Sequence, residues 1–388
     1  MKKVISTERV PIKMWLDDIE DGALQQAKNV ANLPFIFKHL SIMPDSHQGY
    51  GMPIGGVLAT KGVVIPNAVG VDIGCGMCAM KTNFVGIQKQ TLHGIVDMIK
   101  ERIPVGFAHQ HEPQDEGYMP QGFDIDEMFI VKNQYKSALH QIGTLGGGNH
   151  FIEIQKDEDG HIWVMIHSGS RNIGLKVASH YNKVAERLNA MWFSEIEKSK
   201  ELAFLPIQTQ EAKDYFSEMN YCIEFALCNR KLMMDRVKDC FISIIPDIKF
   251  EPLINIAHNY AKWEHHFNSE VIIHRKGATS ARDMEEGIIP GSMGTKSYIV
   301  EGLGNPDSFM SCSHGAGRKM GRKQACRELN LEKEMTMLND QEIIHDIYCN
   351  KDLDEAPGAY KDIDVVMDNQ KDLVKVLYEL KPIAVIKG

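Results

Sequence analysis

The sequence GTLGGGNHFIEIQKDEDGHIWVMIHSGSR, residues 143–171, carries the clearest structural signal in the chain. Two apolar segments, 151–154 and 162–166, are separated by a polar turn around residues 157–160. This pattern is typical of a β-hairpin. A glycine-rich loop precedes the first strand, and a Ser-Gly-Ser-Arg loop follows the second. Loops at strand ends commonly carry function, so we expect both loops to contribute to a functional site.

The rest of the chain predicts a mixture of strands and helices. The predicted strands are 57–59, 63–65, 270–274 and 297–301, and the predicted helices are 176–203, 209–243 and 317–338, with a break near Pro206. Glycine-rich loops are spread from residue 45 to residue 317, and no linker-like segment separates them. We therefore predict one interwoven α+β domain, residues 1–388. In it, central β-sheets are flanked by helices, and the stretch at about 176–245 is a helical insertion.

The composition is that of an ordinary globular protein. Of the 388 residues, 43% are hydrophobic and 24% are charged, close to the usual mix. No run of about 18 apolar residues is present, so we expect no membrane span. The first residues, MKKVISTER, are followed by no apolar signal core, and the 8 cysteines are scattered along the chain. Both features predict a cytoplasmic protein with reduced thiols.

The net charge is −9, which disfavours a protein that binds nucleic acid through its overall charge. A polyanion can still bind at a local basic patch. Basic clusters occur at 275–276, at Arg282 and at 318–323. Charge runs of this kind form either solvated helix faces or phosphate contacts, and the sequence leaves both interpretations open.

The segment VDIGCGMC, residues 71–78, contains a carboxylate and a thiol on either side of a glycine-rich turn. Asp72 and Cys75 can converge there, and such a pair suits a borderline metal such as Mn²⁺, Fe²⁺ or Zn²⁺. Cys75 and Cys78 also form a CxxC motif, which is typical of redox proteins and zinc fingers. No second cysteine pair has ligand spacing, and no thioredoxin-like pattern surrounds the motif. We therefore disfavour the redox and zinc-finger interpretations and keep Cys75 as a candidate metal ligand.

Three histidines have settings that suit metal ligands. His150 follows a run of glycines, His167 ends an apolar strand, and His258 lies in NIAHN, residues 255–259. A single histidine is more often a hydrogen-bonded structural residue than a ligand. Imidazole is nevertheless the commonest transition-metal ligand, and the strand-end position of His167 favours the metal interpretation.

Two glycine-containing loops are candidates for phosphate binding: PGSMGTKS, residues 290–297, and SCSHGAGR, residues 311–318. Glycine lets backbone N–H groups approach a phosphate, although neither loop matches the Walker or the Rossmann pattern. His314 is flanked by small residues, and Arg318 and Arg322 follow it on the predicted helix. A neutral imidazole can attack a phosphoryl group when nearby cations neutralise the developing charge. His314 is therefore a candidate nucleophile.

These segments, taken in order, resemble the RtcB family of RNA ligases. The resemblance runs from residue 43 to residue 388 and is weakest in the helical stretch 176–245. The matching segments are MPDSHQGYG (43–51), VDIGCG (71–76), GTLGGGNHFIE (143–153), HSGSR (167–171), IPGSMG (289–294), SHGAGR (313–318), APGAYKD (356–362) and Lys387-Gly388. Each segment alone is common, whereas this set in this order is highly specific.

The resemblance implies a compact α+β domain with a deep metal-containing cleft. His314 would attack the α-phosphate of GTP and form a histidine–GMP intermediate, and Asp45 resembles the group that orients or deprotonates the incoming 5′-hydroxyl. The implied ligands of two Mn²⁺ ions are Asp72, Cys75, His150, His167 and His258, with Cys75 as the bridge. The family does not require a second thiol at Cys78, which we interpret as a packing residue. The implied contacts are Glu153, Ser292, Ser297, Tyr360 and Lys387 to guanosine, Asn149, Asn259, Ala316 and Gly317 to phosphate, and Arg171 and Arg322 to RNA phosphates.

The implied reaction uses GTP and Mn²⁺ to join an RNA 3′-phosphate or 2′,3′-cyclic phosphate end to a 5′-hydroxyl end. Transfer of GMP to the 3′-phosphate supplies a leaving group, and two metal ions neutralise charge. Fragments of tRNA or rRNA, in splicing or in repair, are the expected partners, and the involvement of an activating protein is left open. Two other classes remain as alternatives. One is a metal-dependent phosphoesterase or nuclease that needs neither His314 nor GTP, and the other is an RNA-binding paralogue that does not ligate.

Overall fold

Two β-sheets form the framework of the computed structural model, which describes residues 1–388. The six-stranded sheet has the order β1-β2-β3-β4-β12-β11, and the seven-stranded sheet has the order β10-β6-β8-β7-β17-β15-β14. β13 pairs with β16 and β5 with β9, and only β2 and β3 run parallel. Strands that are distant in the sequence are neighbours in both sheets, as expected for an interwoven chain.

The strands are β1 (Lys3–Ile5), β2 (Ile12–Met14), β3 (Ile36–His47), β4 (Ile54–Thr60), β5 (Val63–Val64), β6 (Gly76–Val85), β7 (Phe151–Lys156), β8 (His161–Ser168), β9 (Leu205–Pro206), β10 (Ile254–Ala257), β11 (Asn259–His266), β12 (Ser269–Lys276), β13 (Ala278–Ser280), β14 (Glu286–Ile289), β15 (Ser297–Gly302), β16 (Ser311–Ser313) and β17 (Val374–Lys387). The α-helices are α1 (Asp21–Ala31), α2 (Lys89–Arg102), α3 (Phe129–Gln141), α4 (Arg171–Met191), α5 (Gln210–Ile244), α6 (Arg322–Glu328), α7 (Leu331–Asp340) and α8 (Ile363–Asp368).

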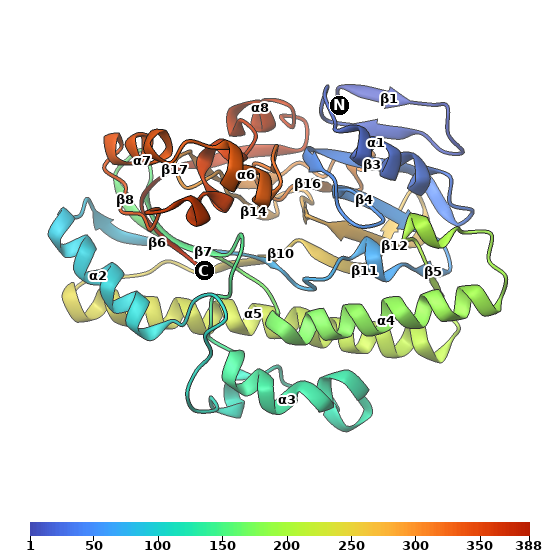
Figure 1. Cartoon of the computed structure of the whole chain (residues 1–388), viewed down its shortest axis with the longest axis horizontal. Helices are drawn as coiled ribbons and strands as arrows, with labels where there is room; N and C mark the ends of the chain where they lie inside the picture. Colours follow the sequence, from blue (N-terminus) through green and yellow to red (C-terminus); the bar gives the residue numbers. More distant parts are fainter.

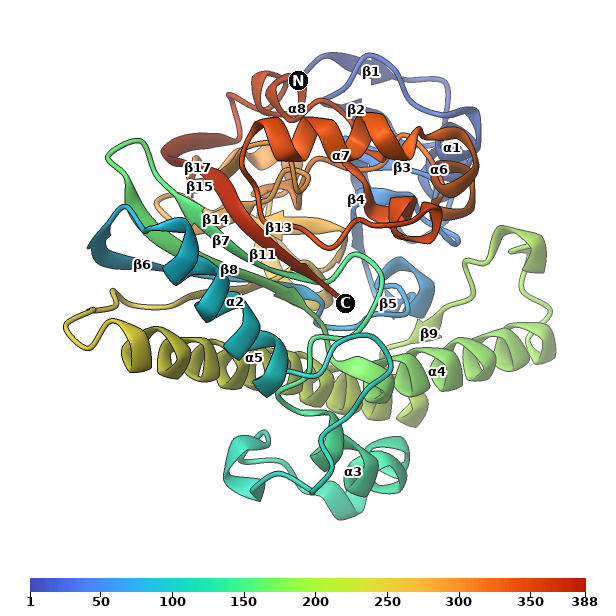
Figure 2. The same ribbon diagram turned by 60° about the vertical axis from the view of Figure 1, so that its left-hand side comes forward.

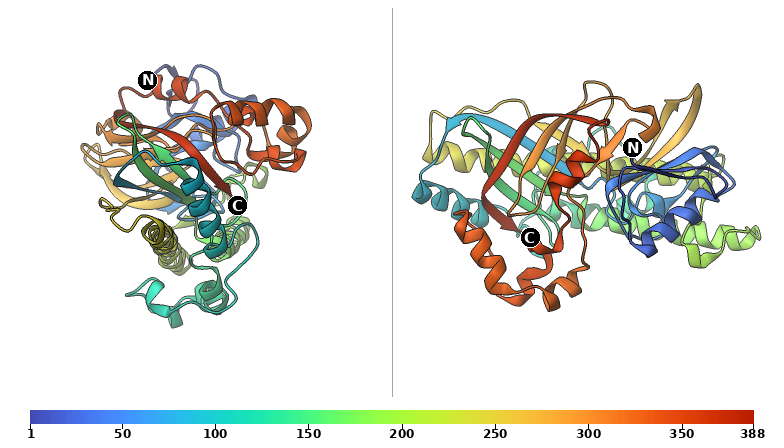
Figure 3. Two further views of the ribbon diagram at one scale, coloured as in Figure 1. Left: turned by 90° about the vertical axis from the view of Figure 1, so that its left-hand side faces the viewer. Right: turned by 90° about the horizontal axis from the view of Figure 1, so that it is seen from above.

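The elements are stacked in layers. The long helices α4 and α5 run side by side beneath the sheets, and α3 lies below them (Figure 1). The helices α6, α7 and α8 lie on the opposite side of the sheets, and Figure 3 shows the same stacking from the side and from above. The end of β17 lies between the α6–α7 region and the α4–α5 layer (Figure 2). The chain therefore ends between these two layers, although Gly388 itself is exposed.

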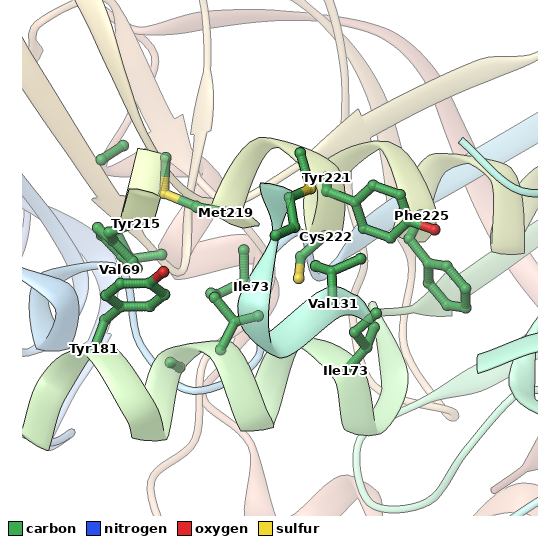
Figure 4. Close-up of a cluster of buried hydrophobic side chains, with 14 of the residues drawn as sticks. Val69, Ile73, Val131, Ile173, Tyr181, Tyr215, Met219, Tyr221, Cys222 and Phe225 are labelled. Carbon is green, nitrogen blue, oxygen red and sulfur yellow. The ribbon is translucent and has the colours of Figure 1, made fainter. Parts of the chain in front are cut away.

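An apolar core between α3, α4 and α5 anchors the turn that precedes β6. Ile73, from this turn, is buried among the side chains of α4 and α5, close to Cys222 (Figure 4). Gly74 adopts a φ of +73°, and a β-carbon at this position would lie 2.8 Å from Ile223 Cα. The turn therefore rests directly on the backbone of α5, which only glycine permits. This contact fixes the positions of its neighbours Asp72 and Cys75.

The predicted hairpin is confirmed as β7 and β8, the predicted strands 57–59, 270–274 and 297–301 lie within β4, β12 and β15, and 63–65 extends one residue past β5. The break near Pro206 is confirmed as well. α5 begins directly after Thr209, whose side-chain oxygen accepts a hydrogen bond from the Ala212 backbone N–H at 3.3 Å. This is the N-cap contact that favours a helix start.

The predicted helix 176–203 is wrong at both ends, because α4 spans Arg171–Met191. Phe193 has a φ of +53°, a left-handed conformation that ends a helix. The Asn189 side chain then exchanges two hydrogen bonds with the backbone of Phe204, at 2.7 and 3.1 Å, and turns the chain back. Apolar spacing alone does not reveal either contact.

The predicted helix 317–338 is also wrong as a single element. It consists of α6 and α7, which are separated because Asn330 caps α7 by accepting a hydrogen bond from the Lys333 backbone N–H at 2.9 Å. Arg318 lies before α6 and forms a bridge with Tyr360, so it is not helical. The sequence did not predict this break, because the charged residues continue with helical spacing from α6 into α7.

The predicted α+β class is confirmed by the two sheets and the helical layers that flank them. The stretch 176–245 contributes one of these layers and much of the buried core. The extent of the domain, residues 1–388, stays a prediction. No helix combines the length and the apolar character that crossing a membrane would require.

Candidate functional site

The five predicted metal ligands converge in two overlapping clusters. One cluster contains Cys75, His167 and His258, and the other contains Asp72, Cys75 and His150. Within each cluster the ligand atoms lie within 4.8 Å of one another. Cys75 Sγ lies 3.3 Å from His167 Nε2 and 3.5 Å from His150 Nε2. Cys75 is the one residue that belongs to both clusters.

Four adjacent strands of the seven-stranded sheet bring these ligands together. Asp72 and Cys75 precede β6, His150 precedes β7, His167 lies at the end of β8, and His258 follows β10. The order β10-β6-β8-β7 makes all four strands neighbours. The pairing registers then align the ends of these strands, so residues far apart in the sequence meet at one edge of the sheet.

The cluster is buried on one side and open on the other. Cys75, His150, His167 and His258 are between 2% and 5% exposed, whereas the Asp72 side chain is 34% exposed. Burial holds the pKa of His167 and of His258 well below the usual range, so both rings are neutral, the form that binds metals. Burial raises the pKa of the Cys75 thiol, and the neighbouring Asp72 raises it further.

The residues fit a two-metal centre. His167 Nδ1 lies 3.0 Å from the Asn149 carbonyl oxygen, so Nδ1 donates and Nε2 is left as a ligand atom facing Cys75. His258 Nδ1 is buried and has no hydrogen-bond partner. Such an atom costs about 1–3 kcal/mol unless something binds it. A set of carboxylate, thiolate and imidazole donors is compatible with Mn²⁺, Fe²⁺ or Zn²⁺.

Cys78 lies outside both clusters and faces α5. It is buried in a core that includes Ile152, Ile166 and Met233. Burial raises the pKa of its thiol to about 12. These surroundings support its interpretation as a packing residue.

His314, whose side chain is 14% exposed, pairs with Asp45 beside the metal clusters. The Asp45 Oδ2 atom lies 2.6 Å from His314 Nδ1 and accepts a hydrogen bond from the His314 backbone N–H at 3.1 Å. Asp45 is fully buried, and the His314 and His258 rings are 4.8 Å apart. Because Nδ1 donates to the carboxylate, the Nε2 lone pair of His314 is free to react. The structure therefore places Asp45 against the candidate nucleophile.

The loop after β16 approaches the site through two close contacts. The Ala316 backbone N–H donates to the Pro290 carbonyl oxygen at 2.9 Å, which joins the two candidate phosphate loops. Gly317 has a φ of +74°, and a β-carbon there would collide with the Asp45 carbonyl oxygen. Glycine is therefore required at position 317.

Two arginines flank the glycine-rich loop that precedes β7. A β-carbon at Gly146 would collide with Arg171 Nη2, and one at Gly148 would lie 2.8 Å from Arg322 Nη2. Arg171 Nη1 lies 3.1 Å from His150 Nδ1, and its backbone adopts a φ of +59° at the start of α4. A left-handed conformation of a non-glycine residue is uncommon and is found most often at functional sites.

Three of the five predicted guanosine residues, Glu153, Ser297 and Lys387, lie on the adjacent strands β7, β15 and β17. Gln155 Nε2 donates to Glu153 Oε2 at 2.6 Å and to Ser297 Oγ at 3.1 Å. Burial raises the pKa of Glu153 to about 8, against the opposing effects of Lys387 and Gln155. Burial also lowers the pKa of Lys387. Nearby, Ser292 bonds to Thr295 through its backbone N–H, at 2.7 Å.

A second group of predicted residues meets at Glu355, which the sequence did not reveal. Its buried carboxylate lies 2.9 Å from Arg318 Nη1 and 2.7 Å from Arg322 Nε, and it also accepts a hydrogen bond from the Tyr360 hydroxyl.

Asn259, a predicted phosphate contact, has a different environment. Its amide donates to the Asp72 carbonyl oxygen at 3.0 Å and accepts from the Gly277 backbone N–H at 2.7 Å.

The fold and the site together define an α+β protein with a candidate metal centre, in which two ligand clusters share Cys75, beside a histidine oriented by a carboxylate. The chain belongs to the RtcB family, since the family model described as tRNA-splicing ligase RtcB matches residues 26–388. The predicted resemblance is thereby confirmed.

Curated relatives match over nearly their whole length. The chain is 40% identical to the RNA-splicing ligase RtcB of Escherichia coli K12, with 100% of this chain and 99% of the relative covered. It is 31% identical to the tRNA-splicing ligases RtcB of Thermococcus kodakarensis and Pyrobaculum aerophilum, with 98% of this chain and 95% of each relative covered.

Proposed function

We propose that this protein is an RNA ligase that uses GTP and Mn²⁺ to join an RNA 3′-phosphate or 2′,3′-cyclic phosphate end to a 5′-hydroxyl end. The observation that carries the proposal is the position of His314, which is held by Asp45 with its Nε2 free and its ring 4.8 Å from that of His258. A nucleophile next to metal ligands is the arrangement that nucleotidyl transfer needs. The names of the curated relatives, RNA-splicing and tRNA-splicing ligases, support the RNA-ligase part of the proposal.

In the first step, the lone pair of His314 Nε2 forms a bond to the α-phosphorus of GTP, and the bond to the β-phosphate breaks. Pyrophosphate leaves, and GMP remains on the histidine. The ring gains positive character as this bond forms, and the Asp45 carboxylate at Nδ1 stabilises it. Asp45 thus acts first on the nucleophile, and any action on the incoming 5′-hydroxyl would come later.

In the second step, an oxygen of the RNA 3′-phosphate attacks the phosphorus of the histidine adduct, and His314 leaves. The RNA end then carries GMP in a 3′,5′ pyrophosphate linkage. In the third step, the 5′-hydroxyl oxygen attacks the RNA 3′-phosphorus, GMP departs, and the hydroxyl proton is released. A cyclic phosphate end is first opened by water to give the 3′-phosphate.

Two bound Mn²⁺ ions would be held by the two clusters that share Cys75, and they would supply charge neutralisation at the attacking and leaving oxygens. The chain itself supplies orientation. Glu153 and Lys387 lie in the buried network proposed to bind guanosine, whereas Arg171 and Arg322 flank the glycine-rich loop proposed to approach RNA phosphates. Fragments of tRNA or rRNA are the proposed substrates.

A ligation experiment tests this function. The purified protein is incubated with Mn²⁺, GTP and two RNA strands, one ending in a 3′-phosphate and one beginning with a 5′-hydroxyl. We expect a joined product that requires both GTP and His314. Removal of the 3′-phosphate without joining, independent of GTP, would favour a phosphoesterase. RNA binding without any change at the ends would favour a non-ligating paralogue.

A further inference from the structure

Arg230 is a fully buried arginine in the middle of α5. It forms no ion pair with any Asp or Glu, although a buried cation without a carboxylate partner is costly. By contrast, the other fully buried arginine, Arg275, pairs with Glu264. The free energy that keeps Arg230 in place must come from its other contacts.

Those contacts are with three separate segments of the backbone. Arg230 Nη1 donates to the carbonyl oxygens of Gly74 and Ser168, at 3.1 and 2.8 Å, and Nη2 donates to that of Ile256 at 3.1 Å. The remaining Nε donates to Asn255 Oδ1 at 2.8 Å. Arg230 therefore donates four hydrogen bonds, and a guanidinium group has five N–H donors in all.

Each of these carbonyls lies within two residues of a candidate metal ligand. Gly74 precedes Cys75, Ser168 follows His167, and Ile256 lies two residues before His258. These are the three members of one metal cluster. One side chain thus connects the backbone segments that carry all three ligands.

We propose that Arg230 is a positioning residue that sets the geometry of the metal centre by holding the segments of Cys75, His167 and His258 in register. This inference rests on the metal-binding part of the proposed function. Arg230 lies on a helix and is distant in the sequence from every motif that led to the site, although its side chain contacts two of those motifs in the structure.

The effect of Arg230 must come from geometry rather than from charge. A guanidinium near a divalent cation repels it, so charge alone would weaken metal binding. The benefit is the planar, rigid fork, which bonds several acceptors at fixed angles and which a lysine cannot reproduce. Metal–ligand distances must hold within about 0.2 Å, so a small shift between the three segments is sufficient to lower affinity.

The test compares Arg230→Lys and Arg230→Met with Arg236→Met. Arg236 lies on the same helix, but it contacts Gly143 and Gln114 and none of the three ligand segments. Mn²⁺ affinity is measured by the electron paramagnetic resonance of free Mn²⁺ during titration. The absorption spectrum of the Co²⁺-loaded protein, with its thiolate charge-transfer band, reports the ligand geometry. Circular dichroism establishes that each variant is folded.

We expect both Arg230 variants to bind Mn²⁺ about 10- to 100-fold more weakly, the usual effect of losing a residue that supports metal ligands. Their Co²⁺ spectra should change, and Arg236→Met should resemble the wild type in both measurements. A folded Arg230→Lys protein with wild-type affinity and spectrum would overturn the proposal, as would tighter binding by Arg230→Met.

If neither Arg230 variant folds, Asn255→Ala decides, because it keeps the arginine and removes the acceptor of Nε. Weaker Mn²⁺ binding by Asn255→Ala would support the proposal, and unchanged affinity would overturn it. These measurements do not depend on catalysis. A wild-type protein that binds Mn²⁺ but forms no GMP adduct would refute the proposed function, while the role of Arg230 would still be decided by the titrations.

Discussion

The Asp45–His314 pair leads to a prediction that separates orientation from charge. Both the His314 backbone N–H and the Nδ1 proton point at the same carboxylate oxygen, Asp45 Oδ2, whereas Oδ1 has no partner. In Asp45→Asn, two donors therefore select the amide oxygen for the Oδ2 position. The variant keeps the orientation and the tautomer of His314 and loses the negative charge, while its amide nitrogen takes the partnerless Oδ1 position.

The size of each loss follows from this geometry. A hydrogen bond to a charged group contributes about 1.5–3 kcal/mol and a neutral one about 0.5–1.5 kcal/mol. Losing the charge therefore costs about 1–1.5 kcal/mol, which slows transfer of GMP to His314 by about tenfold. Asp45→Ala also loses the orientation and leaves the buried His314 N–H unpaired, so we expect a rate about 10³- to 10⁴-fold below that of the wild type.

The assay is the single-turnover transfer of label from α-labelled GTP to the protein in the presence of Mn²⁺. Ser46→Ala is the matched control, because Ser46 is the buried neighbour of Asp45 and its hydroxyl has no hydrogen-bond partner. Its rate should equal that of the wild type. The reasoning is refuted if a folded Asp45→Ala protein reacts within tenfold of the wild type, or if Asp45→Asn is as slow as Asp45→Ala.

Three further predictions concern metal binding, pH and backbone strain. Cys75→Ser should lose at least one of the two proposed Mn²⁺ ions, because Cys75 belongs to both clusters; metal analysis after gel filtration checks this, and retention of two ions contradicts it. Burial lowers the pKa of Lys276 to about 7. Between pH 7 and 9 this lysine therefore loses its proton in the folded chain and keeps it in the unfolded chain. The free energy of unfolding of the wild type, relative to that of Lys276→Met, should then rise by about 2 kcal/mol from pH 7 to pH 9. Urea titrations at each pH measure it, and a difference that does not change with pH would refute the lowered pKa of Lys276. Gly317→Ala should lower the melting temperature, because the left-handed backbone costs at least about 1 kcal/mol and the β-carbon meets Asp45; an unchanged melting temperature would argue against this contact.

Local patterns in the sequence predicted much of the fold. The apolar segments around residues 157–160 predicted a hairpin correctly, because alternation and turn residues are properties of neighbouring positions. Helix ends were harder to predict. The end of α4 depends on the hydrogen bonds between Asn189 and Phe204, and the break before α7 depends on one cap at Asn330.

The convergence of the metal ligands could be expected from the family resemblance, but its physical cause could not. Strand order decides it, since β10, β6, β8 and β7 are neighbours although other elements separate them in the sequence. Long-range pairing of this kind leaves no periodic signal in one chain.

Residues that support the site were missed for a related reason. Glu355 forms ion pairs with Arg318 and Arg322, which lie more than 30 residues earlier in the chain, so no local pattern links the three residues. Arg230 left one signal that could have been noticed: it is a charged residue, beside Asn229, on an otherwise apolar face of a long helix. A polar pair at such a position indicates buried hydrogen-bond partners.

The most direct test of the central claim is to look for GMP on His314. Wild type and His314→Ala are incubated with α-labelled GTP and Mn²⁺, separated under denaturing conditions, treated with acid and mapped by mass spectrometry. The account predicts an acid-labile label on the wild-type peptide that contains His314 and none on the variant. A metal-loaded wild type that takes up no label from GTP, or a variant labelled as strongly as the wild type, would contradict it.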